Sequence, residues 1–287
     1  DLLDDELNDI LDIDMGEFGF DAIEEENEDY EIIEDEIPEV PEEPKSKHGD
    51  IYQLGNHRLM CGDSTSEEDV LKLMEGKEAD LLVTDPPYNV NVENSEGMTI
   101  ENDNLSDDEF KEFLNKAFMN ANKILKKGGA FYIWYADSEA INFRTACQNN
   151  DLLVKQCLIW VKNGFNFGRQ DYKWQHEPCL YGWKEGAGHY FVDEYNHSTV
   201  IEEQVDVNKM NKDQLKEYVN KLLQSPISTT VIKENKHTKN DLHPTMKPLN
   251  LIARQIKNSS KKREIVADIF GGSGSTLMVC EQTKRIC

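Results

Sequence analysis

The chain has 287 residues and a formal net charge of −25, enough sequence for one large domain or two smaller ones. Residues 1–44 hold 21 of the 56 Asp and Glu residues and no Lys or Arg, so the remainder, with 35 acids and 31 bases, has a charge of only −4. The acidic balance belongs to one tail and does not exclude nucleic acid as a partner. No stretch approaches about 18 consecutive apolar residues and no signal peptide is visible, which predicts a soluble, cytoplasmic protein without membrane contact.

The cysteine and histidine pattern does not suggest a metal site. Six cysteines, at positions 61, 147, 157, 179, 280 and 287, form no CxxC pair, which favours reduced thiols over disulfides or zinc. The stretch His176–Cys179 lacks the H-x-E and P-C-x-x-C spacings of zinc deaminases. We therefore predict that the chain binds no metal.

The first elements in chain order are a tail, a hairpin and a helix. Residues 1–47 are acidic and end in a Pro/Glu-rich run, which predicts a flexible linker. Residues 49–63 predict a hairpin that turns at Gly55-Asn56 and ends before Asp63. Thr65-x-x-Glu68 has the pattern of a capping box, so a helix is expected from there to Met74.

The next stretch, Ala79–Tyr88, combines a buried strand with an abrupt stop. Its apolar half is typical of a central parallel strand, and Pro86 and Pro87 prevent the ladder from continuing beyond Asp85. Asp85 and the Pro86 carbonyl could accept the two N–H groups of an exocyclic amine, while Tyr88 stacks on its ring. The alternative is a rigid turn in which Asp85 serves only as a cap.

Strands and helices then alternate. Residues 89–105 are polar and predict a loop over the site. Ser106-x-x-Glu109 caps a helix with an apolar stripe, and Gly128-Gly129 is expected to end the helical segment that follows. A strand over residues 130–135, a helix over 138–148 and a strand over 153–161 come next. This alternation predicts an α/β fold with a parallel sheet.

From Lys162 onward, aromatic, polar and basic residues interleave, a pattern suited to nucleic-acid contact. We expect Arg169, Tyr172 and Lys173 to contact DNA, and Trp183 and Phe191 to form an aromatic sub-core. Residues 193–242 look like an insertion with a helix over 212–223 and a strand over 229–232. Segment 233–263 holds nine Lys and Arg against two acids. We therefore expect Lys236 and Lys239 to contact phosphates, although a solvated helix face is the alternative.

The last segment predicts a ligand loop between a strand and a helix. A helix over residues 247–258 begins at Pro248, and a buried strand follows over 265–270. Gly271, Gly272 and Gly274 let a ligand approach the backbone where the next helix starts at Ser275. A P-loop would need Lys in place of Gly274, and a dinucleotide fingerprint would need Gly in place of Leu277.

Three motifs together resemble the amino-group DNA methyltransferases. Asp-Pro-Pro-Tyr at 85–88 is similar to their catalytic motif in its adenine-N6 branch. Residues 268–276 (DIFGGSGST) resemble their S-adenosylmethionine loop, and residues 243–248 (HPTMKP) the motif preceding it. The catalytic motif comes first, as in the permuted β group. The resemblance implies a Rossmann-like, circularly permuted class I methyltransferase fold with a mostly parallel sheet, S-adenosylmethionine as cofactor, double-stranded DNA as substrate, and flipping of the target base.

The resemblance also assigns roles to residues. The catalytic set is Asp85, Pro86, Pro87 and Tyr88, and the cofactor set is Asp268, Phe270, Gly271, Gly272, Gly274, Thr276, Lys247 and Asp63. For Lys247 a phosphate contact remains open as well. The resemblance implies that residues 48–163 form the catalytic half, 164–242 the target-recognition region and 243–287 the cofactor half, truncated before the acidic residue that holds the ribose hydroxyls.

Several alternatives stay open. The first residues resemble the tail of a ParB-like domain, which would precede the enzyme in a longer bacterial or phage protein, and a homodimer is compatible with the family. Cytosine-N4 enzymes usually carry Ser where Asp85 stands, and RNA or protein-amide methyltransferases usually carry Asn. The alternative from a different functional class is a DNA-binding module that is not an enzyme.

Overall fold

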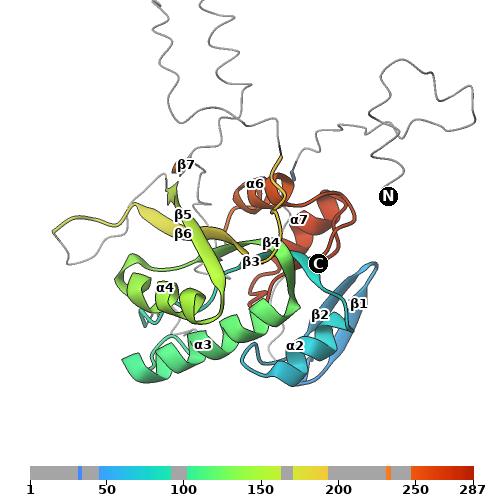
Figure 1. Ribbon diagram of the computed structural model, residues 1–287, viewed down its shortest axis with the longest axis horizontal. Coiled ribbons are helices and arrows are strands. Elements are labelled where there is room, and N and C mark those ends of the chain that lie inside the picture. The colour runs from blue at the N-terminus through green and yellow to red at the C-terminus, as the bar shows by residue number, and fades with distance from the viewer. Residues whose placement is uncertain (1–31, 34–44, 92–101, 163–170, 193–230, 234–246) are drawn as a thin grey trace, which may run out of the picture. The chain divides into compact units, whose positions relative to one another are not determined.

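The computed structural model describes residues 32–33, 45–91, 102–162, 171–192, 231–233 and 247–287, all within one unit, Ile32–Cys287. At its centre lies a six-stranded sheet with the strand order β7-β5-β6-β4-β3-β8 (Figure 1). The strands are β3 (Ala79–Thr84), β4 (Leu125–Trp134), β5 (Leu152–Val161), β6 (His176–Lys184), β7 (Val231–Lys233) and β8 (Val266–Ala267).

One strand of this sheet runs against the others. β3 pairs in parallel with both β4 and β8, and β5 pairs in parallel with β7. β6 lies between β4 and β5 and is antiparallel to both. The predicted α/β fold with a mostly parallel, Rossmann-like sheet is therefore confirmed, with one reversed strand in its interior.

Helices cover both faces of the sheet (Figure 1). On one side lie α2 (Glu67–Met74), α3 (Asp107–Ile124) and α4 (Ala140–Asn149), which follows a 3-10 turn at Asp137–Glu139; on the other lie α6 (Leu249–Ser259) and α7 (Ser275–Gln282). Alternate residues of β3 enter the two cores, Leu82 on the α3 side and Leu81 and Val83 on the α6 side. Because both faces are covered, β3 has a continuous apolar sequence. Within the described residues no helix is both long and apolar enough to cross a membrane.

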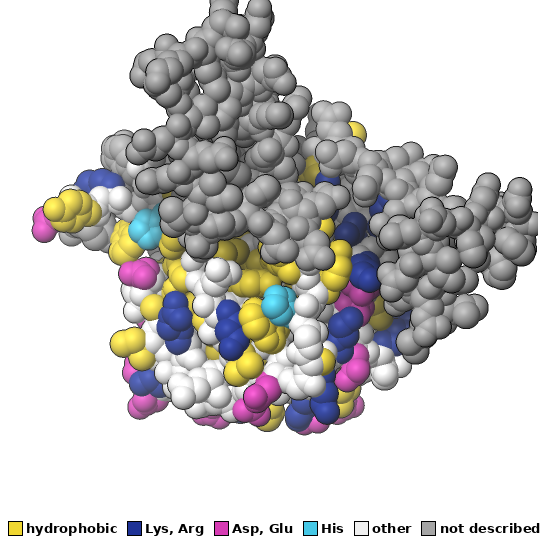
Figure 2. Space-filling view, turned by 45° about the horizontal axis from the view of Figure 1, so that its top comes forward, with side chains coloured by type: hydrophobic (Ala, Val, Ile, Leu, Met, Phe, Trp, Pro, Cys, Tyr) yellow, Lys and Arg dark blue, Asp and Glu magenta, His cyan; other side chains and the backbone are white. Residues whose placement is uncertain are grey.

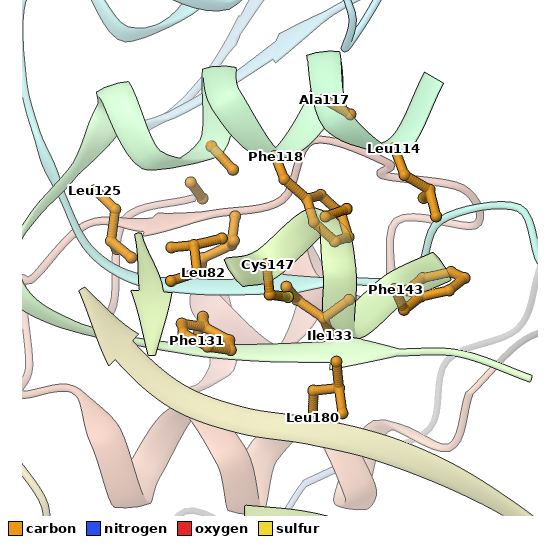
Figure 3. Close-up of a cluster of buried hydrophobic side chains, with 14 of the residues drawn as sticks. Leu82, Leu114, Ala117, Phe118, Leu125, Phe131, Ile133, Phe143, Cys147 and Leu180 are labelled. Atoms are coloured by element: carbon orange, nitrogen blue, oxygen red, sulfur yellow. The ribbon is translucent and has the colours of Figure 1, made fainter. Parts of the chain in front are cut away.

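The core beneath α3 is built from the apolar stripe that the sequence predicts (Figure 3). Its members are all buried: Phe110, Phe113, Leu114, Ala117 and Phe118. The rings of Phe110 and Phe118 each lie 6.0 Å from the ring of Phe143 on α4. Burying a ring of this kind stabilises the fold by roughly 1.5–3 kcal/mol. The capping box expected at the start of α3 is present. Ser106 is the N-cap, its side chain accepts the Glu109 N–H, and the Glu109 side chain accepts the Ser106 N–H.

The predicted hairpin is present and is tied to the far end of the chain. β1 (Ile51–Leu54) and β2 (His57–Met60) pair around Gly55-Asn56, where Gly55 has a φ of +61°. The buried His57 ring holds the hairpin in place, with Nε2 2.7 Å from Glu281 Oε2 of α7. Its Nδ1 accepts the Cys287 backbone N–H at 2.9 Å.

The predicted start of α2 is wrong by one residue. Ser66 is the N-cap, and its Oγ accepts the Asp69 N–H at 3.3 Å. Thr65 makes a different bond, since its Oγ1 donates to Asp63 Oδ1 at 2.8 Å. The sequence offers two adjacent hydroxyls as possible N-caps. Because the Thr65 hydroxyl is bonded to Asp63, the Ser66 hydroxyl caps the helix.

The prediction that Gly128-Gly129 ends a helix is also wrong. α3 ends at Ile124, and both glycines lie within β4. A Cβ on Gly128 would stand 2.3 Å from the Gly188 carbonyl oxygen. The glycine therefore serves close packing against a neighbouring segment.

The boundaries near the glycine loop differ as well. β8 contains two residues rather than the predicted six, although Ile265 adds a parallel bridge to Ile286. Pro248 is the N-cap of α6, so Lys247 lies just outside the helix that was predicted to include it. The apolar run at residues 265–270 is therefore longer than the hydrogen-bonded strand within it.

Part of the predicted linker contacts the folded unit. The Ile33 N–H donates to Gln282 Oε1 at 3.0 Å, and the Ile33 carbonyl accepts from Gln282 Nε2 at 2.9 Å. Ile32 packs against the core beneath α6. Ile32 and Ile33 are therefore attached to the folded unit, so the prediction of a flexible linker does not hold at these two residues.

Several predictions fall outside the described residues. They are the tail at 1–31 and 34–44, the loop at 92–101, the helix at 212–223, the motif residues 243–246, and Arg169, Lys236 and Lys239. The described part of the inserted strand, β7, joins the edge of the main sheet beside β5. β6 also lies in the range assigned to target recognition, yet it is an interior strand of the sheet.

Close packing along β6 gives a test of the fold. A Cβ on Gly182 would stand 2.0 Å from the Leu153 carbonyl oxygen and 2.7 Å from Phe131 Cζ. We expect Gly182→Ala to lower the free energy of unfolding by about 2 kcal/mol or more, because overpacking forces β5 and β6 apart. Gly188→Ala is the control, since a Cβ there meets nothing within 4 Å. Equal urea-unfolding midpoints for the two variants would contradict this packing.

Candidate active site

Two neighbouring strands end side by side at the carboxyl edge of the sheet. β3 and β8 pair in parallel, with Leu82 opposite Ala267, so Asp85 and Asp268 follow adjacent strand ends. From β3 the chain passes to β4 on one side, whereas from β8 it passes through α7 to Ile286 on the other. The strand order therefore reverses between β3 and β8, and ligands of open α/β sheets bind at such switch points.

A buried hydrogen-bond network joins the two strand ends. Thr84 Oγ1 donates to Asp268 Oδ1 at 3.0 Å. Thr276 Oγ1 donates to Asp268 Oδ2 at 2.7 Å, and the Phe270 N–H donates to Oδ1 at 3.0 Å. Burial raises the pKa of Asp268, while these three donors oppose the rise. Asp268 thus holds the start of the glycine loop against β3.

The glycine loop leaves its backbone open. A Cβ on Gly271 or Gly274 would meet nothing within 4 Å. Gly272 and Gly274 have φ values of +49° and +81°, which side chains rarely adopt. Gly274 is the N-cap of α7 and no side chain caps this helix. An uncapped helix N-terminus behind open glycines suits a ligand with a carboxylate or other anionic group.

The carboxylate of Asp85 is held by two partners. The Tyr88 hydroxyl donates to Oδ1 at 2.6 Å, and Lys247 Nζ donates to Oδ2 at 2.6 Å. Lys247 Nζ also lies 3.0 Å from the Tyr88 hydroxyl oxygen. Burial, together with the Asp85 charge, raises the pKa of Tyr88 well above its ordinary value. Tyr88 is therefore neutral at physiological pH and acts as a donor to Asp85.

Lys247 belongs to a longer line of charges. Its Nζ lies 3.2 Å from Glu177 Oε2, and Glu177 Oε1 pairs with Lys162. Burial favours neutral Lys247, but Asp85 and Glu177 outweigh it and raise its pKa to about 12. Burial likewise favours neutral Glu177, but Lys247 and Lys162 lower its pKa to about 2. Lys247 and Glu177 are therefore both charged at pH 7.

Aromatic rings lie beside the two lysines of this line of charges. Lys247 Nζ lies 5.3 Å from the centre of the Trp134 ring and 5.4 Å from that of Tyr88. Lys162 Nζ lies 5.3 Å from the centre of the Trp160 ring. The Tyr88 backbone N–H donates to Asp103 Oδ1 at 3.1 Å, which fixes the residue after the two prolines. The two ammonium groups thus lie beside aromatic rings, and the turn after β3 is fixed by Asp103.

The structure brings together most of the predicted site residues that it describes. Asp85, Tyr88, Lys247, Asp268 and Thr276 belong to the two connected networks above. Phe270 turns its ring toward the core, 5.8 Å from the Phe113 ring. Asp63 is exposed, and its carboxylate accepts the Thr65 N–H and hydroxyl in its own turn.

Tyr172 and Lys173 are exposed and lie in the short segment before β6, which begins at His176. Because β6 is antiparallel to β4, its first residues lie at the same sheet edge as Asp85. Figure 2 shows Lys and Arg side chains interspersed with Asp and Glu. On the face that Figure 2 shows, the described residues therefore do not form a continuous basic surface.

Sequence reasoning missed Lys162, Trp134 and Asp103, and it gave Glu177 no individual role, although the family resemblance places the stretch His176–Gly182 beside the target-base pocket. One signal was present, since Glu177 stands near the start of the mostly apolar strand β6 and Lys162 directly follows the apolar end of β5. A charge in such a place is rarely buried unless it is paired. The signal does not name the partner, because the pairs join segments far apart in the sequence.

The lowered pKa of Glu177 predicts a pH-dependent contribution to stability. Its folded-state pKa of about 2 lies below the ordinary 4.5, so the contribution is complete above pH 4.5 and is lost as pH falls through 2. By linkage it amounts to about 3 kcal/mol. We expect Glu177→Gln to lower the free energy of unfolding at pH 7, and the deficit to shrink below pH 4.5.

Urea unfolding of both proteins over this pH range measures the deficit. Glu112→Gln is the control, because Glu112 pairs with Lys116 on the exposed face of α3 and should change stability by less than about 1 kcal/mol. A Glu177→Gln deficit that is the same at every pH would contradict the lowered pKa.

Comparison with known proteins identifies the family of this chain. Residues 79–287, which begin at β3 and include both networks, match the family model of N6 and N4 methylases, described as DNA methylase. The chain is 26% identical over 236 residues to the type II methyltransferase M.HpaI of Haemophilus parainfluenzae, covering 80% of this chain and 68% of that protein. It is 24% identical over 233 residues to the DNA adenine methyltransferase YhdJ of Escherichia coli, covering 79% and 75% respectively.

A solved structure shares the fold. The crystal structure of the M1.HpyAVI–SAM complex aligns with a TM-score of 0.53 at 20% identity, covering 78% of this chain and 88% of that one. The family match covers more than half of the chain and includes Asp85, Glu177, Lys247 and Asp268. The chain therefore belongs to the N6 and N4 DNA methylase family.

Proposed function

We propose that this protein transfers a methyl group from S-adenosylmethionine to the N6 amine of adenine in double-stranded DNA. The observation that carries the proposal is that Asp85 and the glycine loop follow the ends of two paired strands, β3 and β8, at the point where the strand order reverses. The name of the relative YhdJ, a DNA adenine methyltransferase, supports adenine as the acceptor.

The residues after β3 suit an exocyclic amine. Each oxygen of Asp85 accepts one hydrogen bond in the structure, from Tyr88 or from Lys247. A carboxylate oxygen can accept about two, so Asp85 retains capacity for an amine N–H. The Pro86 carbonyl is the second acceptor. Drawing both N–H groups into these bonds localises the nitrogen lone pair, which is otherwise delocalised into the base and is a poor nucleophile.

The glycine loop is the proposed cofactor site. When bound, S-adenosylmethionine supplies a methyl group on a positively charged sulfur. The open backbone at Gly271, Gly272 and Gly274 admits a close ligand, and the uncapped N-terminus of α7 suits its carboxylate. Thr276 and Asp268 hold this loop in place. Phe270 supports the loop from the α3 core, and we keep Asp63 as a predicted contact to the cofactor.

DNA is proposed to approach the same sheet edge. Tyr172 and Lys173 are exposed there, and Arg169, Lys236 and Lys239 remain predicted phosphate contacts. Phosphate contacts give affinity that falls with salt and carries no sequence information. The site of methylation is then set by the recognition region between residues 164 and 242.

The first test identifies the product and the role of Asp85. The protein is incubated with unmethylated bacterial genomic DNA and labelled S-adenosylmethionine, and the DNA is digested to nucleosides. We expect N6-methyladenine, and we expect Asp85→Ala to lower kcat at least about 100-fold, as loss of a charge-stabilising group does. S-adenosylhomocysteine binding by calorimetry should stay within about threefold of the parent, since Asp85 makes the predicted contact to the amine.

Asp80→Ala is the matched control, because Asp80 lies at the amino end of the same strand and pairs with Lys126. If the product is N4-methylcytosine, the acceptor is cytosine and the proposal of adenine as the acceptor is wrong. Activity of Asp85→Ala within tenfold of the parent would remove Asp85 from the reaction.

The second test concerns base flipping. The N6 amine cannot reach a cofactor inside the duplex, so the adenine must leave the stack and rest on Tyr88. We expect Tyr88→Ala to weaken DNA binding by roughly 1–3 kcal/mol. Tyr88→Phe retains the ring but loses the donor to Asp85, so it should bind DNA normally and lower kcat. Once sequencing locates the methylated adenine, 2-aminopurine at that position should brighten on binding. Unchanged fluorescence would exclude flipping.

A further inference from the structure

Three charged side chains outside the Asp-Pro-Pro-Tyr motif form a line of ion pairs that ends at Asp85. In order they are Lys162, Glu177 and Lys247, and each pairs with the next before Lys247 reaches Asp85 Oδ2 at 2.6 Å. They come from three separate elements, the end of β5, the start of β6 and the residue before the Pro248 cap. None of the three belongs to the glycine loop.

The backbones of two members are fixed by the sheet. Trp160 and Glu177 are opposite each other in the β5–β6 register. Beyond β5, the Lys162 N–H donates to the Gln175 carbonyl at 2.8 Å, and Gln175 Nε2 donates to the Lys162 carbonyl at 3.2 Å. The backbones of Lys162 and Glu177 are therefore fixed relative to each other. The second carboxylate oxygen of Glu177, Oε2, faces Lys247.

Lys247 has little freedom to move from its place. Its side chain is only 6% exposed, and the rings of Trp134 and Tyr88 lie near its ammonium group. In such surroundings an ammonium group that leaves its carboxylates loses their attraction without gaining water. The two carboxylates thus define one position for Nζ, between Glu177 and Asp85.

We infer that Lys247 is a positioning residue for Asp85, and that Glu177, held by Lys162, fixes Lys247 in that position. Lys247 and Tyr88 each take one oxygen of Asp85, so two donors set the plane of the carboxylate. The remaining acceptor capacity then has a fixed direction before the amine arrives. This preorganisation is what makes a charged group effective in a reaction. The inference rests on the proposed function.

This role differs from the two that the sequence left open for Lys247. A lysine that binds a cofactor carboxylate or a DNA phosphate must offer its charge to the ligand. The charge of Lys247 is already shared by two carboxylates within hydrogen-bonding or ion-pair distance. Loss of Lys247 should therefore change kcat rather than the affinity for cofactor or for DNA.

The test uses four variants of the whole chain. They are Lys247→Arg, Lys247→Met, Glu177→Gln and the double variant Lys247→Met/Glu177→Gln. Lys247→Met leaves two partly buried carboxylates short of a partner and can fail to fold. The double variant removes one charge of each sign, so the cluster stays neutral and the chain should fold. Lys126→Met is the matched control, because it breaks a lysine–aspartate pair at the other end of β3.

For each variant we would measure kcat and KM for unmethylated bacterial genomic DNA, and the Kd for S-adenosylhomocysteine. We expect Lys247→Met and the double variant to lower kcat about 100-fold, Glu177→Gln about tenfold, and Lys247→Arg less than Glu177→Gln. KM and Kd should stay within about threefold of the parent in all of them. Lys126→Met should match the parent in kcat.

Three results would overturn the inference. A Kd for S-adenosylhomocysteine weakened more than about tenfold by Lys247→Met, with kcat retained, would assign Lys247 to the cofactor. A raised KM for DNA with unchanged kcat would assign it to phosphate. A double variant with the parental kcat would show that Lys247 and Glu177 contribute to stability and not to the positioning of Asp85.

The geometry can be tested apart from activity. If the parent transfers no methyl group to any base, the proposed function fails. A crystal structure of the double variant then decides the positioning claim by itself. Positioning predicts that the Asp85 carboxylate rotates or takes several conformers, whereas an unchanged carboxylate would show that Lys247 does not orient it.

Discussion

The parallel pairing of β3 with β8 is the constraint on which the site depends. It joins residues far apart in the chain, Leu82 and Ala267, and places the ends of both strands at one edge of the sheet. Parallel strands pair only through long connections, so this contact is supported by tertiary structure on both faces. Thr84 and Asp268 then connect the two strand ends directly. Without this pairing, the Asp-Pro-Pro-Tyr turn and the glycine loop would be two unrelated loops.

A second constraint is the cost of burying charge. Asp85, Lys247, Glu177 and Lys162 lie among Trp134, Trp160 and Tyr88 and are stable there because each charge has an opposite neighbour. Replacing the whole cluster with apolar side chains often costs nothing in stability, whereas breaking it does. We therefore attribute the three charges that accompany Asp85 to the positioning of its carboxylate. The strand β6, which carries Glu177, contributes to the sheet and to the site at once.

Local patterns predicted much of this molecule. The apolar run of β3, the stripe of α3 and the Gly55-Asn56 turn are local features, and the structure confirms each of them. The errors arose where two neighbouring residues offered the same chemistry, as at Thr65 and Ser66, or where a glycine served packing rather than helix termination, as at Gly128. Partners such as Glu177 for Lys247 depend on which strands become neighbours. No local pattern in one sequence contains that information.

The central claim is that Asp85 and the glycine loop form one site. A crystal structure of the protein with S-adenosylhomocysteine tests it most directly. The account predicts that the amino-acid part of the ligand lies against Gly271–Gly274 and that its sulfur is directed toward Asp85, with Lys247 still on the carboxylate. A ligand bound away from the glycine loop, or a sulfur separated from Asp85 by intervening side chains, would contradict the account.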